Sequence, residues 1–244
     1  MRTTRTVFEM GLREYARSPV LLALLVFLPA YFILVFASVM PATPVPVDIA
    51  GRGTMTIELS SLTPVLMAPL ATALVGGIAG LFMMQSARDV DSRLSLVGVT
   101  GRELLLARAG LLTVAALVAS LVSLGVLLIV HVPEMVGWFL IATVIVGLMY
   151  GGFGALIGLA FNRLAGIYLL MFGPLLDIFL AQSPLAEQSP AIATYLPAHF
   201  PMKLVFDAAF TARIDLSNLV WALWYLLLIG LLVGVAFGRI LRAE

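Results

Sequence analysis

The chain has 244 residues, of which 62% are hydrophobic and only 11% charged, and its mean hydropathy is +1.12. So few charged side chains cannot cover the water-facing surface of a protein of this size, which excludes an ordinary soluble protein and indicates a membrane protein. The net charge of +1 gives no reason to expect a nucleic acid as partner. Cysteine is absent, which excludes disulfides, iron–sulfur clusters and thiol nucleophiles.

Residues 1–18 predict an amphipathic helix that lies in the membrane interface. Phe8 and Leu12 recur at helical spacing on an apolar side, whereas Glu9 and Arg13 are four residues apart on another face. Such a helix places its arginines near anionic lipid headgroups. Two interpretations stay open: a basic flank that only fixes the topology, or a lever that acts against a soluble partner.

Six stretches are long and apolar enough to cross a bilayer, because about 20 helical residues of about 1.5 Å each span its hydrocarbon core. They lack the alternation of barrel strands, so each is expected to be a helix with internally satisfied backbone groups. The expected fold is all-α, a polytopic membrane protein with one transmembrane domain over residues 1–244. The six spans are expected at about 20–40, 64–84, 104–130, 135–160, 164–182 and 219–240.

Local capping signals predict where two of these helices begin. Ser18 precedes Pro19, whose missing N–H costs nothing in a first helical turn, so the first helix should start there. Thr100 and Glu103 have the spacing of a capping box, which predicts that the third span begins at Gly101.

The segment 85–103 between the second and third spans carries charges of both signs. Topology alone explains its arginines but not its acids. Mixed charge beside an apolar ridge suits a docking surface, because complementary charge fixes the register and apolar anchors supply affinity. A plain solvated loop is the alternative. The candidate docking residues, on a short cytosolic helix, are Arg88, Asp89, Val90, Asp91, Arg93 and Leu94.

The segment 183–217 before the last span contains four prolines between moderately apolar patches. It is too polar for a full span and too apolar for a free loop, so we expect short re-entrant or interfacial helices there. Asp177, in the outer half of the fifth span, is a functional candidate because an acid at that depth is costly. Alternatively, Gly173 and Pro174 break the helix just before it, and Asp177 caps the next segment from the outer interface.

Arginine and lysine are concentrated on one side of the predicted spans. Of the fourteen, only Arg52, Lys203 and Arg213 fall on the other side. Because positively charged short loops stay cytoplasmic, both termini and the 85–103 loop are expected to face the cytosol, in the cell membrane.

Small residues recur four positions apart in several predicted spans. Such rows let helix backbones approach closely, and packing within the chain is a better explanation for them than a dimer seam. The rows are Gly76 and Gly80, Gly147 and Gly151, Gly154 and Gly158, and Gly230, Gly234 and Gly238.

The stretch SRLSLVGVTGRELLLAR, residues 92–108, resembles the segment of ABC-2 type permeases in which a charged cytosolic helix leads through a short apolar bend into span three. The rest of the chain is similar to that family too, including the proline-rich LPAHFPMKLVFDAAF at residues 196–210. The resemblance implies a second permease copy or homologue, and two ATP-binding cassette ATPase subunits that carry the ATP and Mg²⁺. It also implies that residues 86–97 are the coupling helix and that the outer segment is a gate or lid.

The expected function is the membrane subunit of an exporter that moves a lipid, drug or hydrophobic peptide out of the cytoplasm. No catalytic residue, metal or cofactor is expected in this chain. Its only lysine, Lys203, is in no Walker A motif, so ATP hydrolysis is expected on another polypeptide. By the resemblance, the substrate path runs between the two permease copies, with candidates Met67, Phe172 and Asp177. The alternatives are an ion-coupled secondary transporter and the membrane subunit of an assembly or cofactor-delivery complex.

Overall fold

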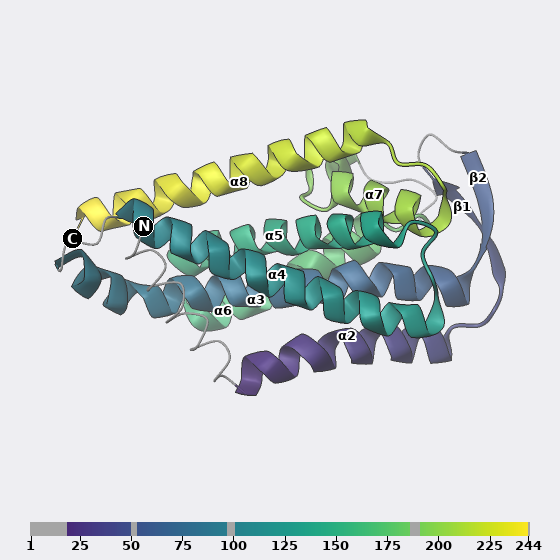
Figure 1. Cartoon of the computed structure of the whole chain (residues 1–244), viewed down its shortest axis with the longest axis horizontal. Helices are drawn as coiled ribbons and strands as arrows, with labels where there is room; N and C mark the ends of the chain where they lie inside the picture. Colours follow the sequence, from purple (N-terminus) through teal and green to yellow (C-terminus); the bar gives the residue numbers. More distant parts are fainter. Residues whose placement is uncertain (1–18, 50–52, 97–100, 186–190, 244) are drawn as a thin grey trace.

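The computed structural model describes residues 19–49, 53–96, 101–185 and 191–243 (Figure 1). The chain is 82% helical, so the predicted helical class is confirmed. The helix predicted over residues 1–18, with Phe8, Glu9, Leu12 and Arg13, lies outside the described residues. The described α-helices are α2 (Pro19–Val39), α3 (Leu59–Leu96), α4 (Gly101–Val130), α5 (Val136–Ala160), α6 (Arg163–Pro174), α7 (His199–Phe210) and α8 (Leu216–Ala243).

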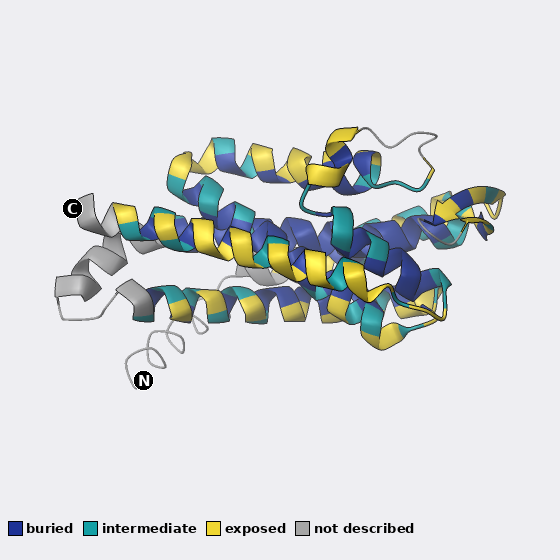
Figure 2. Cartoon of the chain, turned by 90° about the horizontal axis from the view of Figure 1, so that it is seen from above, coloured by how far each residue is buried: buried dark blue, intermediate teal, exposed yellow. Residues whose placement is uncertain are grey.

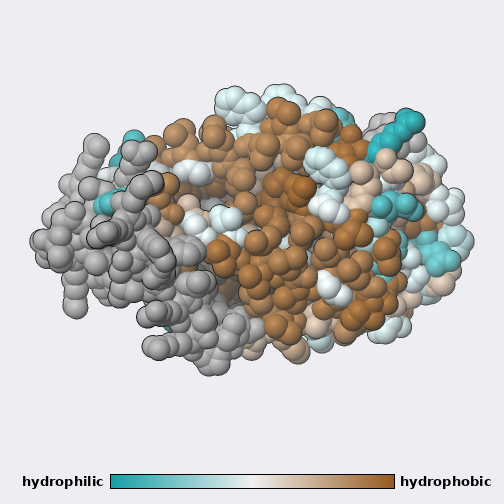
Figure 3. Space-filling model, viewed as in Figure 1, coloured by the Kyte–Doolittle hydropathy of each residue, from teal (hydrophilic) through white to brown (hydrophobic). Residues whose placement is uncertain are grey.

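Within the described residues, five helical stretches have the length and apolar composition to cross a membrane, and α2 adds a shorter apolar stretch, Leu25–Val39. This set is compatible with a membrane protein. Large apolar side chains are exposed on α4, α6 and α8. Hydrophobic residues cover the middle of the face shown in Figure 3. The five stretches are Leu59–Gln85, Glu103–Val130, Val136–Ala160, Arg163–Ala181 and Leu216–Arg239.

The bounds of α3 differ from those predicted. The predicted capping residues Ser18 and Thr100 lie outside the described residues, so the helix starts at Pro19 and Gly101 stay predictions. Helix α3 begins at Leu59 and continues to Leu96, so the second span and the predicted coupling helix form one continuous helix. The physical reason is that residues 85–97 contain no glycine or proline that would end the helix.

A β-hairpin between α2 and α3 corrects the all-α expectation. Strands β1 (Pro44–Ile49) and β2 (Gly53–Glu58) pair antiparallel, and Val47 lies opposite Met55. Every second residue near the end of β1 is buried, as expected of a strand with one face on the core. Its prolines argue against a central strand but are tolerated in a two-stranded ribbon, where both strands are edges.

The core forms where α3 crosses α5, and Figure 2 shows the buried residues concentrated in the centre of the bundle. The span of α3 is 89% buried in the bundle, compared with 17% for that of α8. A Cβ at Gly80 would overlap the carbonyl oxygen of Gly151, and one at Gly154 would overlap that of Gly77. These helices therefore touch through their backbones, and the predicted packing of glycine rows within the chain is confirmed for α3 and α5.

The glycine row of α8 behaves differently. A Cβ added at Gly230 or Gly238 would meet no atom within 4 Å, and one at Gly234 would meet only Leu105, at 3.4 Å. The prediction that this row packs within the chain is therefore wrong, because α8 lies at the edge of the bundle.

The helices run between two distinct ends of the molecule (Figure 1). At one end, α2 begins, α3, α5 and α8 finish, and α4 and α6 begin. At the other end lie the hairpin and α7. Hydrophilic side chains gather at the hairpin end in Figure 3. We call the hairpin end the distal end and the opposite one the proximal end.

Candidate functional site

A buried carboxylate lies near the distal end, in a segment where the helix changes its winding. After Pro174, α6 continues as the π-helix η1 (Leu175–Ala181) rather than breaking. Such π segments are rare and occur often at functional sites. Asp177 lies within η1 and is only 3% exposed, so the prediction that Gly173 and Pro174 break the helix just before it is wrong.

Three donors surround the Asp177 carboxylate. Its Oδ2 accepts a hydrogen bond from the Tyr150 hydroxyl at 2.6 Å and another from the backbone N–H of Ala198 at 2.9 Å. Its Oδ1 accepts one from Nε2 of Gln182 at 3.1 Å. The carboxylate is the acceptor in all three hydrogen bonds, as expected of its ionised form, and charge-assisted hydrogen bonds of this kind are short. The geometry therefore satisfies a buried anion with dipoles rather than with a cation.

These contacts fix helix α7 at its first turn. The first N–H groups of any helix lack partners within it, and Asp177 takes the N–H of Ala198, the residue just before α7. The alternative prediction was a cap on the next segment from the outer interface, whereas the observed contact is to the start of α7 and is made inside the bundle. Asp177 thereby ties α7 to η1 and, through Tyr150, to α5.

The other end of α7 is held by the loop between α4 and α5. The carbonyl of Ala208 accepts from the N–H of Met135 at 2.9 Å, and the carbonyl of Ala209 accepts from the N–H of Glu134 at 3.3 Å. The ring of His131 packs on Phe210, with centroids 5.4 Å apart. Burial lowers the pKa of His131, which keeps this ring neutral near physiological pH. Helix α7 is thus anchored at both termini.

Gln182 extends the network from Asp177 to His199. Its Nε2 donates to the carbonyl of Ala193 at 2.9 Å as well as to Asp177, so its Oε1 is left to accept from Nδ1 of His199, at 3.1 Å. This assigns the proton of the neutral imidazole to Nδ1. Burial, together with the charge of Lys203, lowers the pKa of His199 to about 4, so Nε2 is an acceptor at neutral pH.

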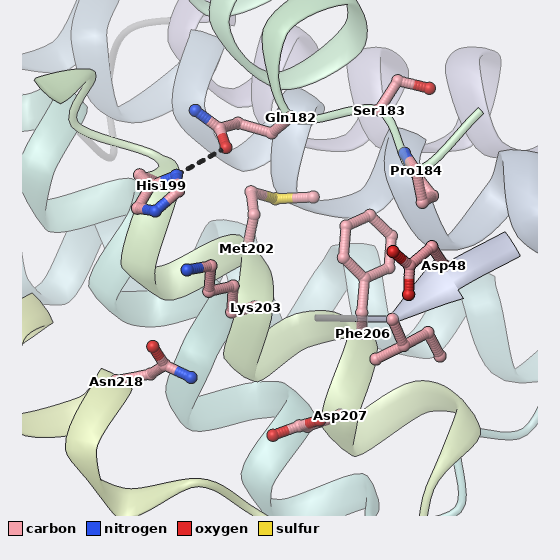
Figure 4. A pocket seen from close by; sticks show the side chains of 11 residues that line it. Asp48, Gln182, Ser183, Pro184, His199, Met202, Lys203, Phe206, Asp207 and Asn218 are labelled. Atoms are coloured by element: carbon pink, nitrogen blue, oxygen red, sulfur yellow. Dashed lines mark hydrogen bonds between the residues drawn. The ribbon is translucent and has the colours of Figure 1, made fainter. Parts of the chain in front are cut away.

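A small cavity of about 100 Å³ lies beside this network at the distal end (Figure 4). It is bounded by the end of β1, the segment after η1, helix α7 and the first turn of α8. Asp207 is buried in its wall and accepts from the N–H of Asp215 at 3.0 Å. The other polar residues that line it are Asp48, Gln182, Ser183, His199, Lys203 and Asn218.

At the proximal end, polar contacts mark where α3 leaves the bundle. Arg108 donates from Nη1 to the carbonyl of Met83 at 2.7 Å, and Gln85 donates to the carbonyl of Phe161 at 3.3 Å. Arg163 lies over the ring of Phe82, 4.6 Å from its centroid. Beyond Gln85 the backbone of α3 stays helical to Leu96. The predicted docking residues Arg88, Asp89, Val90, Asp91, Arg93 and Leu94 lie on this extension, and their side chains are outside the described residues.

The predicted path residues are not brought together. Met67 is buried in the core at 1% exposure, Phe172 is 56% exposed on the surface of α6, and Asp177 is held in its network. None of them lines the cavity at the distal end. Within the described part of the chain, no group of three or more His, Asp or Glu side chains is arranged to hold a metal ion.

The partners of Asp177 are not evident from local sequence patterns. Tyr150 and Ala198 are 27 and 21 residues away from it, so no local pattern links them. Gln182 follows Asp177 by five residues, a spacing that a π-turn brings together and α-helical periodicity does not. The only available signal was chemical: a buried acid in a membrane span needs donors, and Tyr150 is a donor on the neighbouring span.

In comparisons with known proteins, no family model and no curated protein matches the chain.

Proposed function

We propose that the chain is the membrane-spanning permease subunit of an exporter driven by a separate ATP-binding cassette ATPase. In this proposal, ATP and Mg²⁺ are bound by the ATPase subunit, and a second permease copy or homologue completes the translocation path. The proximal end faces the cytosol and the distal end faces outside, in the cell membrane. The cargo is an amphiphilic or apolar molecule such as a lipid, drug or hydrophobic peptide.

The observation that carries the proposal is the extension of α3. The apolar part of this helix ends at Gln85, and the backbone continues to Leu96, which adds about 16 Å of helix beyond the span. The extension carries the charges of both signs at residues 88–93. Because it is continuous with the most buried span, a push on its tip is transmitted to the centre of the bundle without passing through a flexible joint.

Helix α7 supports a gate at the distal end. It contacts α3, α5 and α8, and its two termini are anchored to η1 and to the α4–α5 loop. Both anchors consist of a few hydrogen bonds, so rearranging the spans relative to one another would move α7 as a unit. This is the arrangement expected of a lid that responds to motion of the helices below it.

The polarity of the interior supports the cargo class. Among the described residues, the buried polar side chains are mainly Ser and Thr, and two aspartates. Both aspartates accept backbone N–H groups, from Ala198 and Asp215 respectively. A strongly ionic cargo would find few uncommitted polar groups within the bundle, whereas an apolar one would not need them. The same commitment of Asp177 to α7 makes an ion-coupled secondary transporter the weaker alternative.

The test is co-expression of the chain with the ATP-binding cassette ATPases encoded in the same genome. We expect one of them to co-purify with the chain and to hydrolyse ATP faster when bound. Reversing two charges on the extension, with Asp89→Arg and Asp91→Arg, should weaken co-purification about tenfold or more at moderate salt. The matched control reverses two exposed acids of the distal end, Glu58→Arg and Glu134→Arg, and should leave the complex intact. Equal loss in both double variants, or no loss in the first, would contradict the docking assignment.

A further inference from the structure

The cavity at the distal end separates opposite charges across an apolar floor. In Figure 4, Lys203 and His199 lie on one side and Asp48 lies on the other, with Met202 and Phe206 between them. Met202 and Phe206 are both buried core residues of α7. A cavity with this layout complements a short molecule that is negative at one end, positive at the other and apolar in the middle.

The positive side is a cation that lacks a carboxylate partner. Lys203 is half-buried, and among the residues that the structure describes it forms no ion pair. Its ammonium lies 5.8 Å from the centroid of the Phe200 ring. Its charge helps to lower the pKa of His199. A phosphate is a strong ligand for such a site, because its oxygens accept charge-assisted hydrogen bonds from lysine.

The negative side is the carboxylate of Asp48 at the end of β1. Within the described ranges, its side chain forms no hydrogen bond or ion pair. Asp48 is exposed to solvent and lines the cavity, whereas the other acid of the lining, Asp207, already accepts from the N–H of Asp215. An ammonium group is the complementary ligand for Asp48.

We propose that this cavity binds a zwitterion that joins a phosphate to an ammonium group, as in the headgroup of an ethanolamine phospholipid. The phosphate lies against Lys203, the ammonium lies against Asp48, and the two methylenes between them lie on Met202 and Phe206. This site holds whether or not the chain is an exporter, because none of these residues belongs to the extension of α3.

The size and depth of the cavity fit a headgroup rather than a whole molecule. Its volume of about 100 Å³ is well below the roughly 300–1,000 Å³ of cavities that enclose a drug-sized ligand, so acyl chains must stay outside. Trp221 stacks on Phe200 with ring centroids 5.9 Å apart, and both Trp221 and Tyr195 are more than half exposed. Exposed tryptophan and tyrosine mark the level of lipid headgroups. Lys203, which lies next to Phe200, is therefore at the right depth.

The test uses histidine as the reporter, because the chain contains only His131 and His199. The full chain, labelled with ¹³C-histidine in phosphate-free maltoside micelles, is titrated with glycerophosphoethanolamine at pH 6 and followed by NMR. A phosphate between Lys203 and His199 raises the pKa of His199, so its signal should move saturably toward the imidazolium position. The signal of His131, at the other end of α7, should not move. An Asn replacement of His131 assigns the two signals.

Separate ligands and variants resolve the two charges. Glycerophosphate and ethanolamine should each bind about tenfold more weakly than the zwitterion. Lys203→Met should abolish the response to both phosphate compounds. Asp48→Asn, at an exposed position that leaves the fold intact, should reduce the zwitterion to the affinity of glycerophosphate. An unchanged His131 signal reports that each variant is folded.

The proposal is overturned if the His199 signal does not move, if all three ligands bind equally, or if Lys203→Met leaves the response unchanged. Dihexanoyl phosphatidylethanolamine identifies the source of the ligand. Tighter binding than glycerophosphoethanolamine supports a membrane lipid, whereas equal binding supports the same site with a free solute. The assay contains no ATPase, so its result is independent of the exporter proposal.

Discussion

Replacing Tyr150 with Phe tests whether the Asp177 network holds the distal end together. The substitution removes the hydroxyl that donates to Asp177 over 2.6 Å and keeps the ring, which is buried between α5 and η1. Asp177 retains its two other donors, from Ala198 and Gln182. The change therefore isolates one hydrogen bond without opening a cavity as large as a methyl group.

Two reference values bracket the expected loss in the free energy of unfolding. Hydrogen bonds between membrane helices contribute about 0.6 kcal/mol on average and about 1.7 kcal/mol at most, whereas bonds to charged groups contribute about 1.5–3 kcal/mol. The Tyr150–Asp177 bond is short, buried and made to a carboxylate, so the values for hydrogen bonds to charged groups apply to it. We expect Tyr150→Phe to destabilise the chain by about 1.5 kcal/mol.

The assay is reversible unfolding of the purified chain in mixed micelles, followed by helical circular dichroism. Tyr168→Phe is the matched control, because Tyr168 is 55% exposed on α6 and should lose almost nothing. A cycle with Asp177→Asn should give a coupling energy of about 1 kcal/mol, since the carboxylate charge strengthens the tyrosine bond. If Tyr150→Phe costs no more than Tyr168→Phe, or if the two sites are additive, Asp177 does not hold the distal end through Tyr150.

Three further predictions concern other parts of the fold. Gly80→Ala should destabilise the chain strongly, because its Cβ would overlap the Gly151 carbonyl oxygen. Gly238→Ala, whose Cβ would meet nothing within 4 Å, should be neutral or stabilise the chain by up to about 1 kcal/mol. Thermal unfolding of the two variants compares these effects. Both histidines have lowered pKa values in the folded chain, so the unfolded chain takes up protons first and stability should fall as the pH drops from about 6.5 toward 4. In unfolding experiments over this pH range, the stability of His199→Asn should depend less on pH. A stability that falls more steeply with decreasing pH in this variant would contradict the prediction. Asp177→Ala should leave the N–H of Ala198 without its acceptor and so speed its hydrogen exchange about tenfold or more, measured on peptides that cover α7.

The sequence predicted those features of the fold that depend on neighbouring residues. The glycine rows of α3 and α5 are an example, because small residues at a four-residue spacing form a flat helix face in any context. The row of α8 has the same pattern but no helix against it, and only the arrangement of the helices distinguishes the two cases.

The missed features depend on contacts between distant residues or on exceptions to local rules. Pro44 and Pro46 argue against a strand, yet β1 forms because its partner β2 is close and Val47 and Ile49 gain burial in the core. Gly173 and Pro174 indicate a helix end, yet the backbone continues as η1, with η1 anchored to α5 through the Tyr150–Asp177 bond. Asp177 was identified from its chemistry, but its cavity-side neighbours Gln182 and His199 were not.

The position of Asp177 also bears on how the two ends of the molecule communicate. An anion in a membrane span must be compensated, and here the compensation comes from three donors on three different segments: α5, the end of η1 and the start of α7. Any motion that separates one of these segments leaves either the carboxylate or its donor unsatisfied, at a cost of about 1–3 kcal/mol for each lost partner. The three segments therefore move together or exchange partners in a discrete step. Helix α5 packs on α3 through backbone contacts at its glycines, so a displacement of the α3 extension reaches Tyr150 through rigid elements and then reaches α7 through a single carboxylate.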